Sequence, residues 1–244
     1  MKEKKMQPHL HLSEVHEICF LSGNPDRVPK IARLLTETEQ VASNRGLVAF
    51  NGKTPNKKVS ISILTTGMGC PSTAIILEEA FRAGGRVFIR IGSCGALKPG
   101  INIGDIVIPY AAVRDERTSL NFAPKKVPAI SSPKIFQKLC ESADKLKINY
   151  YPGIVWTTDI YYSSNHDEYQ KWAYYGVNSV EMESALIFIF GLLKKVKVGT
   201  ILVVDGNLAE GTQKDEGNLG DINEIFQQGV ENAVACAIRT VEIL

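Results

Sequence analysis

Short apolar segments typical of strands alternate along this chain with longer segments of helical spacing. The strand-like segments cover residues 16–22, 45–51, 58–66, 86–92, 104–109, 153–158 and 198–204. The helix-like segments lie near 26–36, 71–84, 132–147, 181–195 and 222–242. This alternation predicts an α/β fold with a mixed, largely parallel twisted sheet flanked by helices. Because no repeat and no Pro- or Ser-rich linker divides the 244 residues, we expect one domain over 1–244.

The composition excludes several classes of protein. A formal net charge of +2 is too small for a surface that coats nucleic acid. The five cysteines are widely spaced and contain no C-x-x-C, which favours a reducing compartment over a disulfide framework. The basic N-terminus lacks an apolar core, and the longest apolar run, 185–193, is too short to span a membrane. We therefore expect a cytoplasmic protein without membrane or nucleic-acid partners.

Two strand-like segments end in residues suited to binding an anion. Val87–Ile89 leads into Arg90-Ile91-Gly92-Ser93-Cys94-Gly95, and Ile18–Leu21 leads into Gly23-Asn24-Pro25-Asp26-Arg27. The glycines predict tight loops that let the backbone approach a ligand, while arginine and serine side chains donate hydrogen bonds. Open α/β sheets bind ligands at the carboxyl ends of their strands, so the two stretches together predict an anion site there.

Other residues allow more than one interpretation. Cys94 is either a nucleophile or a small packing residue, and packing is favoured because no histidine partner is evident. His9-x-His11 is compatible with a metal, but no acidic or cysteine cluster completes a site, so no metal is expected. Asp205 ends the apolar strand 200–204, where partial burial should raise the pKa of its carboxyl.

An ordered series of motifs identifies a family resemblance from about His9 to the C-terminal helix. The motifs are Pro8-His9-Leu10, Gly23–Arg27, Asn44-Arg45-Gly46, Thr66-Gly67-Met68-Gly69, Arg90–Gly95, Val180-Glu181-Met182-Glu183 and Val203-Val204-Asp205-Gly206. In order and spacing they resemble the hexameric nucleoside phosphorylases, which include bacterial and protozoan purine nucleoside phosphorylases and uridine phosphorylase. The resemblance implies a trimer of dimers with sites shared across dimer interfaces, and inorganic phosphate as co-substrate without a cofactor.

The resemblance also assigns the phosphate site. Gly23, Arg27, Arg90 and Ser93 would hold phosphate within one subunit, and Arg45 would reach in from a neighbour. Arginine suits this role because its planar fork presents paired donors to two phosphate oxygens.

The nucleoside site follows in the same way. Glu183 would accept hydrogen bonds from the ribose 2′ and 3′ hydroxyls, and Met182 would pack against the sugar. Glu181 either binds the 2′ hydroxyl or complements the helix dipole, because two residues apart on a helix the two glutamates would not face each other. His9 would cross the dimer interface to the ribose 5′ hydroxyl, and Tyr161 would cover base and sugar.

Asp205 matches the catalytic aspartate that protonates purine N7 in the resembling phosphorylases. The bacterial purine enzymes pair this aspartate with an arginine, which the loop 207–216 lacks, although Lys214 is a possible substitute. The Gln-x-Arg pair by which uridine phosphorylases grip uracil is absent from 163–168. We therefore expect phosphorolysis of purine nucleosides, with 6-oxopurines favoured. The alternatives are a uridine phosphorylase, a hydrolytic nucleosidase on the same fold and a non-catalytic nucleoside-binding protein.

Overall fold

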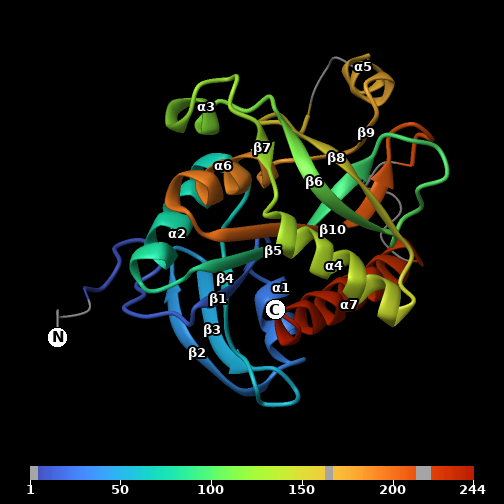
Figure 1. Cartoon of the computed structure of the whole chain (residues 1–244). Helices are drawn as coiled ribbons and strands as arrows, with labels where there is room; N and C mark the ends of the chain where they lie inside the picture. The colour runs from blue at the N-terminus through green and yellow to red at the C-terminus, as the bar shows by residue number, and fades with distance from the viewer. Residues whose placement is uncertain (1–4, 163–166, 213–220) are drawn as a thin grey trace.

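The computed structural model describes residues 5–162, 167–212 and 221–244, which form a mixed sheet with helices packed against it (Figure 1). The strands are β1 (Ile18–Ser22), β2 (Thr36–Asn44), β3 (Leu47–Lys53), β4 (Ser60–Thr65), β5 (Val87–Ala96), β6 (Ile106–Arg114), β7 (Ala129–Ile130), β8 (Tyr150–Thr157), β9 (Val177–Glu181) and β10 (Lys197–Asn207). The helices are α1 (Arg27–Ala32), α2 (Gly69–Arg82), α3 (Thr118–Phe122), α4 (Pro133–Leu146), α5 (Glu168–Tyr174), α6 (Ser184–Lys194) and α7 (Asp221–Glu242).

The sheet closes on itself around β5. This strand pairs with β10 on one side and, near its end, with β9, while β9, β8, β6 and β10 are joined in that order. These five strands therefore form a closed barrel, from which β1, β4, β3 and β2 extend as an open sheet. Neighbours β4, β1, β5 and β10 run parallel, so their carboxyl ends lie at one edge.

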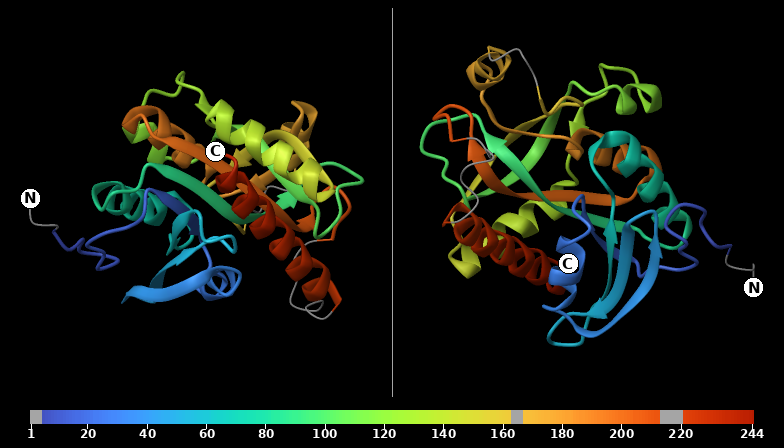
Figure 2. Two further views of the ribbon diagram at one scale, coloured as in Figure 1. Left: turned by 60° about the horizontal axis from the view of Figure 1, so that its bottom comes forward. Right: turned by 180° about the vertical axis from the view of Figure 1, so that it is seen from behind.

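The core occupies both faces of the sheet. Along β5, Val87, Ile89 and Ile91 belong to one apolar cluster, which includes residues of α1, α4 and α7. The alternate residues Phe88 and Cys94 belong to a second cluster, which includes residues of α2 and α6. Because successive strand residues point to opposite faces, helices cover the sheet on both sides, as predicted. Helices α4 and α7 lie side by side (Figure 2).

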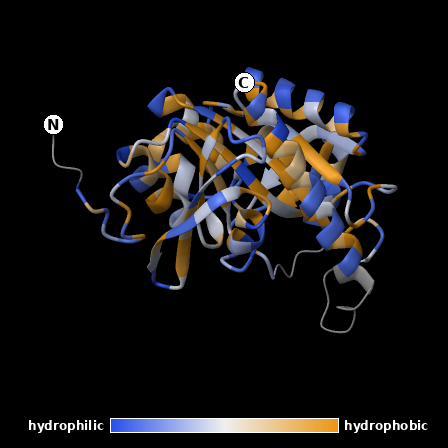
Figure 3. Cartoon of the chain, turned by 90° about the horizontal axis from the view of Figure 1, so that it is seen from below, coloured by the Kyte–Doolittle hydropathy of each residue, from blue (hydrophilic) through white to orange (hydrophobic). Residues whose placement is uncertain are grey.

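Helix α7 is amphipathic, with its apolar residues packed against the sheet. Polar and apolar residues alternate along its length, and hydrophobic strands fill the interior beneath the helices (Figure 3). Its residues Val230, Ala233, Val234 and Ala237 recur at helical spacing and are buried. Among the described helices none is long and apolar enough to span a membrane.

Several elements differ from the expectation. Strand β2 was not predicted, because its exposed residues, such as Glu37, Glu39 and Gln40, give no apolar pattern. Strand β9 and helix α5 also lie in stretches for which no element was predicted. Strand β5 continues to Ala96, so the Arg90–Gly95 segment is not the tight loop that its glycines indicated.

Candidate active site

Arg90 lies inside strand β5, and a glycine makes room for it. A Cβ atom at Gly92 would lie 2.5 Å from the guanidinium carbon of Arg90. The glycine is therefore needed because the arginine folds back over its own strand, rather than for a turn. Arg90 is 5% exposed, so its charge lies in the interior, where an unpaired ion would be costly.

Two buried carboxylates compensate that charge. Nη2 of Arg90 lies 2.5 Å from Oε2 of Glu183, and its Nε lies 3.3 Å from Oε2 of Glu181. Burial lowers the pKa of Arg90, but the charges of Glu183 and Glu181 outweigh this effect and hold the pKa above its usual value. Burial and Glu181 raise the pKa of Glu183, although Arg90 acts in the opposite direction.

The placement of these two glutamates corrects the sequence prediction. Glu181 is the last residue of β9 and Glu183 precedes the first residue of α6, so neither lies within the helix that was predicted over 181–195. In this extended-to-helical junction both side chains converge on Arg90. The expectation that the two glutamates would not face each other assumed that both lie on one helix, and that assumption was wrong.

Glu181 closes the start of helix α6. Its carboxylate accepts hydrogen bonds from the backbone N–H groups of Glu183 and Ser184, and from the hydroxyl of Thr157 at 2.6 Å. A carboxylate at this position complements the helix dipole and satisfies otherwise unpaired amides. Of the two roles considered for Glu181, this geometry fits the dipole role.

Glu183 is tied to a second helix. Its Oε1 accepts a hydrogen bond of 2.6 Å from the backbone N–H of Gly69, the first residue of α2. Each carboxylate oxygen can accept a second hydrogen bond, so Glu183 remains chemically suited to bind hydroxyl groups. The intervening Met182 is half-buried, and its carbonyl accepts a hydrogen bond from the thiol of Cys70.

The loops after β1 and β4 meet beside Arg90. A Cβ atom at Gly23 would lie 3.1 Å from the carbonyl oxygen of Gly67 and 3.9 Å from Nη1 of Arg90. Arg27, at the start of α1, is also buried, and its Nη1 donates to the carbonyl of Ile91. Two guanidinium groups and a glycine-lined approach thus lie at the carboxyl edge of the parallel strands, as predicted.

The surroundings of Arg27 stabilise its positive charge less than those of Arg90 stabilise the charge of Arg90. Burial, together with the positive charge of Arg90, lowers the pKa of Arg27 to about 10, and Asp205 only partly offsets this. A bound anion would restore the balance, since it would add negative charge beside two buried cations. Ser93, the other residue of this strand predicted to bind phosphate, is half-buried on β5 between Gly92 and Cys94.

Asp205 lies where strand β10 breaks its regular pairing with β5. The register shifts between Val204 and Gly206, and Asp205 is the half-buried residue between them. Such a bulge redirects a side chain out of the regular ladder. The charge of Asp205 acts on Arg27 and also contributes, after burial, to raising the pKa of Tyr161. The predicted acid, aromatic and anion-binding residues are therefore close enough to interact.

His9 is held by a residue that the sequence analysis missed. Glu79, which is 4% exposed, accepts hydrogen bonds from the backbone N–H groups of His9 and Leu10, and lies 2.7 Å from Nδ1 of His9. Glu79 follows Ile76 by three residues in α2 and so shares its buried face. A lone acidic residue on an apolar helix face was the available signal.

Arg45 and Tyr161 project outward. Arg45 and Gly46 form the turn between β2 and β3, with φ angles of 56° and 74°. Two positive φ angles are typical of a type I′ hairpin, which places Arg45 at an exposed tip. Tyr161 is 60% exposed and makes an edge-on contact with Tyr162. Neither residue is enclosed by the part of this chain that the structure describes.

Three remaining points concern candidates outside this cluster. Cys94 is buried, and burial raises the pKa of its thiol, which fits the packing interpretation better than a nucleophile. The two histidines considered as a metal-binding pair have different partners, because the ring of His11 contacts Asn44 and that of His9 contacts Glu79. Lys214 and residues 163–166 lie outside the described part of the chain.

Comparisons with known proteins agree with this architecture. The model of the phosphorylase superfamily matches residues 17–242. A guanosine phosphorylase of Halorubrum lacusprofundi is 33% identical over 240 residues, covering 98% of this chain and 99% of the relative. A uridine phosphorylase of Treponema pallidum is 33% identical, covering 96% and 92%. The crystal structure of a uridine phosphorylase from Vibrio fischeri superimposes with a TM-score of 0.91 at 29% identity and full coverage of both chains. The matched length, the shared fold and the ordered motifs show that this chain belongs to the phosphorylase superfamily, as a member of its nucleoside phosphorylases.

Proposed function

We propose that this protein cleaves 6-oxopurine nucleosides with inorganic phosphate, giving the free base and ribose 1-phosphate. The observation that carries the proposal is the position of Asp205, at a strand bulge within electrostatic reach of Arg27 and Tyr161. This position supports the assignment of Asp205 as the proton donor for the base, beside an arginine that would bind phosphate and an aromatic ring that would cover the base.

Each group has a defined part in this reaction. Phosphate, which carries about −1.5 to −2 charges near neutral pH, binds to Arg27 and Arg90 beneath C1′ of the ribose. The bond between C1′ and N9 breaks while a phosphate oxygen forms a bond to C1′. The electron pair left on the purine is neutralised as Asp205 gives a proton to N7. Glu183 holds the sugar hydroxyls and adds negative charge beside the developing cation.

Two observations support a purine over uracil as the base. Residues 163–168 contain no Gln-x-Arg pair to bind the uracil edge. In addition, a relative covered almost completely by this chain is a guanosine phosphorylase. Uridine phosphorylase is the second candidate, because relatives with that name match at similar identity.

The test is to incubate the purified protein with inosine, guanosine and uridine, each with and without phosphate, and to separate the products by chromatography. We expect hypoxanthine and guanine, with ribose 1-phosphate, only when phosphate is present. Equal turnover without phosphate would make the protein a hydrolase. A higher kcat/KM for uridine than for inosine would overturn the base assignment, and binding without turnover would overturn the enzymatic assignment.

We propose that the protein is a homohexamer in which Arg45 serves a neighbouring subunit, and that it needs no cofactor beyond phosphate.

A matched pair of arginine variants tests this role of Arg45 in phosphate binding. Arg45→Ala should then raise the KM for phosphate without affecting the isolated fold, because Arg45 is exposed in this chain. Arg33→Ala, at an equally exposed arginine after α1, should leave the KM for phosphate unchanged. Equal effects of the two changes would contradict the assignment.

A further inference from the structure

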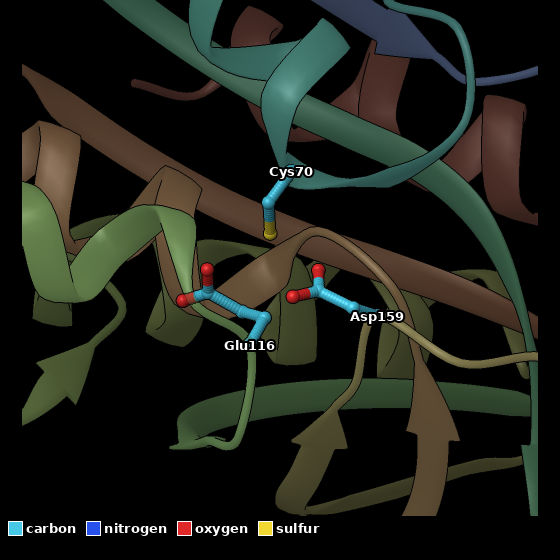
Figure 4. Close-up of side chains that lie close together, drawn as sticks. All are labelled: Cys70, Glu116 and Asp159. Carbon is cyan, nitrogen blue, oxygen red and sulfur yellow. The ribbon is translucent and has the colours of Figure 1, made fainter.

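Three side chains far apart in the sequence converge beside Met182 and Glu183, the residues proposed to contact the sugar. Cys70 lies at the start of α2, Glu116 lies between β6 and α3, and Asp159 follows β8. One potential ligand atom from each lies within 4.8 Å of the other two. Figure 4 shows the Cys70 sulfur pointing toward the two carboxyl groups from above. The proposed reaction does not use this group.

Glu116 provides an independent indication that something binds there. The residue is fully buried, and its Oε1 has no hydrogen-bond partner. A buried carboxylate oxygen without a partner carries a large desolvation cost, which a cation would remove. The other oxygen, Oε2, accepts a hydrogen bond from the backbone N–H of Ser119. That bond fixes the carboxyl group and leaves Oε1 as its available ligand atom.

The surrounding structure holds these ligands in place. Arg114, two residues before Glu116, donates five hydrogen bonds that fasten the segment around α3, to Ser119, Ala123, Pro124 and Val127. Oδ2 of Asp159 accepts a hydrogen bond from the backbone N–H of Arg117. Ligating carboxylates in metal sites are characteristically oriented in this way by outer hydrogen bonds.

We propose that Cys70, Glu116 and Asp159 bind a divalent cation of the zinc class. One thiolate and two carboxylates form a donor set that suits Zn²⁺ and Co²⁺ and disfavours Mg²⁺ and Ca²⁺, which prefer oxygen ligands alone. With Zn–S near 2.3 Å and Zn–O near 2.0–2.2 Å, movements of about 1 Å would bring the three atoms to one ion. Asp159 is exposed, so water can reach the ion and complete its coordination.

A cation at this position would join three elements next to the active site. The thiol of Cys70 donates to the carbonyl of Met182, and the neighbouring Gly69 donates to Glu183. Binding would therefore fasten the start of α2 to the segments after β6 and β8, and would stabilise the folded protein by linkage. The ion would occupy a structural metal site and would take no part in the proposed reaction.

The test is titration of chelator-treated protein with Co²⁺, followed by competition with Zn²⁺ against a chromophoric chelator. We expect one ion per chain, an ultraviolet thiolate-to-cobalt charge-transfer band, and a Zn²⁺-dependent rise in Tm. Cys70→Ser should abolish the band and weaken Zn²⁺ binding by at least about 100-fold, the upper end of what loss of an outer-shell partner costs. Glu116→Gln and Asp159→Asn, which preserve size, should weaken binding while retaining the band.

The matched control is Cys19→Ser. Cys19 is also fully buried, but burial alone raises its pKa, with no carboxylate contributing. This variant should keep the band and the affinity of the unmodified protein. The proposal is overturned if the unmodified protein shows no charge-transfer band, if the band survives in Cys70→Ser, or if both carboxylate variants bind Zn²⁺ as tightly as the unmodified protein. The carboxylate variants still decide the matter if Cys70→Ser fails to fold.

Discussion

Arg90 is proposed to bind phosphate and also neutralises two buried carboxylates. From the sequence, Arg90→Ala would serve as a simple probe of phosphate binding. In the structure, this change leaves Glu181 and Glu183 buried without their cation. Removing one partner of a buried pair costs about 3–5 kcal/mol, so the variant tests stability as well as binding.

We therefore expect Arg90→Lys to separate the two effects. Lysine retains the charge but loses the planar fork, so the KM for phosphate should rise while Tm falls much less than in Arg90→Ala. Thermal unfolding and phosphate saturation curves, measured beside Arg33→Ala as a surface control, check this expectation. If the lysine and alanine variants had the same Tm, the buried ion pair would not be important for stability.

The raised pKa of Glu183 predicts an acid limit for nucleoside binding. Ribose hydroxyls donate to the ionised carboxylate, so the KM for nucleoside should rise as pH falls through a pKa above the ordinary 4.5. The same shift means that Glu183 favours the folded state most below its ordinary pKa, and that this contribution is lost as pH rises through the raised pKa.

The measurement is KM against pH at saturating phosphate. Glu183→Gln should give a high KM that no longer changes over this range, whereas Glu231→Gln, at an exposed position on α7, should behave as the unmodified protein. An acid limb that persists unchanged in Glu183→Gln would assign the titration to another group.

At the scale of elements, the bulge in β10 determines what Asp205 can do. If it donates a proton to N7 only as the bond to C1′ breaks, its loss should reduce kcat more than binding. General acid catalysis contributes about 10²–10⁴-fold, so Asp205→Ala should lose activity on inosine within that range. A nucleoside methylated at N7 already carries the positive charge, so the variant should retain far more activity on 7-methylguanosine. Equal losses on both substrates would make Asp205 a binding or structural residue.

The elements that sequence predicts are those with a clear apolar pattern. The buried strands β1, β4, β5 and β10 and the helices α2, α4, α6 and α7 were found because their cores repeat at strand or helical spacing. Strand β2 was missed because its stability comes from pairing with β3 at an exposed edge. The ends of β5 and α6 were misplaced, because neither the side-chain packing at Gly92 nor the junction after β9 is visible in local propensity.

In the candidate site, too, features that follow from a local sequence pattern could be predicted, and features that depend on tertiary packing could not. The places of Arg27, Arg90 and Asp205 in the fold could be predicted, since each lies within or after a recognisable apolar strand, while their roles in binding and catalysis stay predictions. The contact of Glu79 with His9 and the contacts of Glu181 and Glu183 with Arg90 could not be predicted. They depend on which helix faces which strand end in the folded protein. Long-range pairing of charges is set by the tertiary fold rather than by sequence spacing.

At the scale of the whole molecule, two of the residues predicted to bind substrate face outward. Arg45 lies at an exposed hairpin tip, and His9 is fixed by Glu79 while its side chain remains 39% exposed. Residues held in defined but outward-facing positions are suited to complete the site of a neighbouring copy. In a two-fold dimer each chain would then give His9 to the site that contains its partner's Asp205.

This arrangement predicts that two inactive variants restore each other. His9→Ala and Asp205→Ala would be co-expressed with different affinity tags, and the hybrid oligomers that carry both tags would be isolated by two successive purifications. In each dimer formed by one chain of either kind, one site carries both changes and the other carries neither, so the hybrid should recover up to about half of the unmodified activity. Each variant purified alone provides the baseline. A hybrid no more active than the sum of those baselines would show that His9 and Asp205 act within one chain.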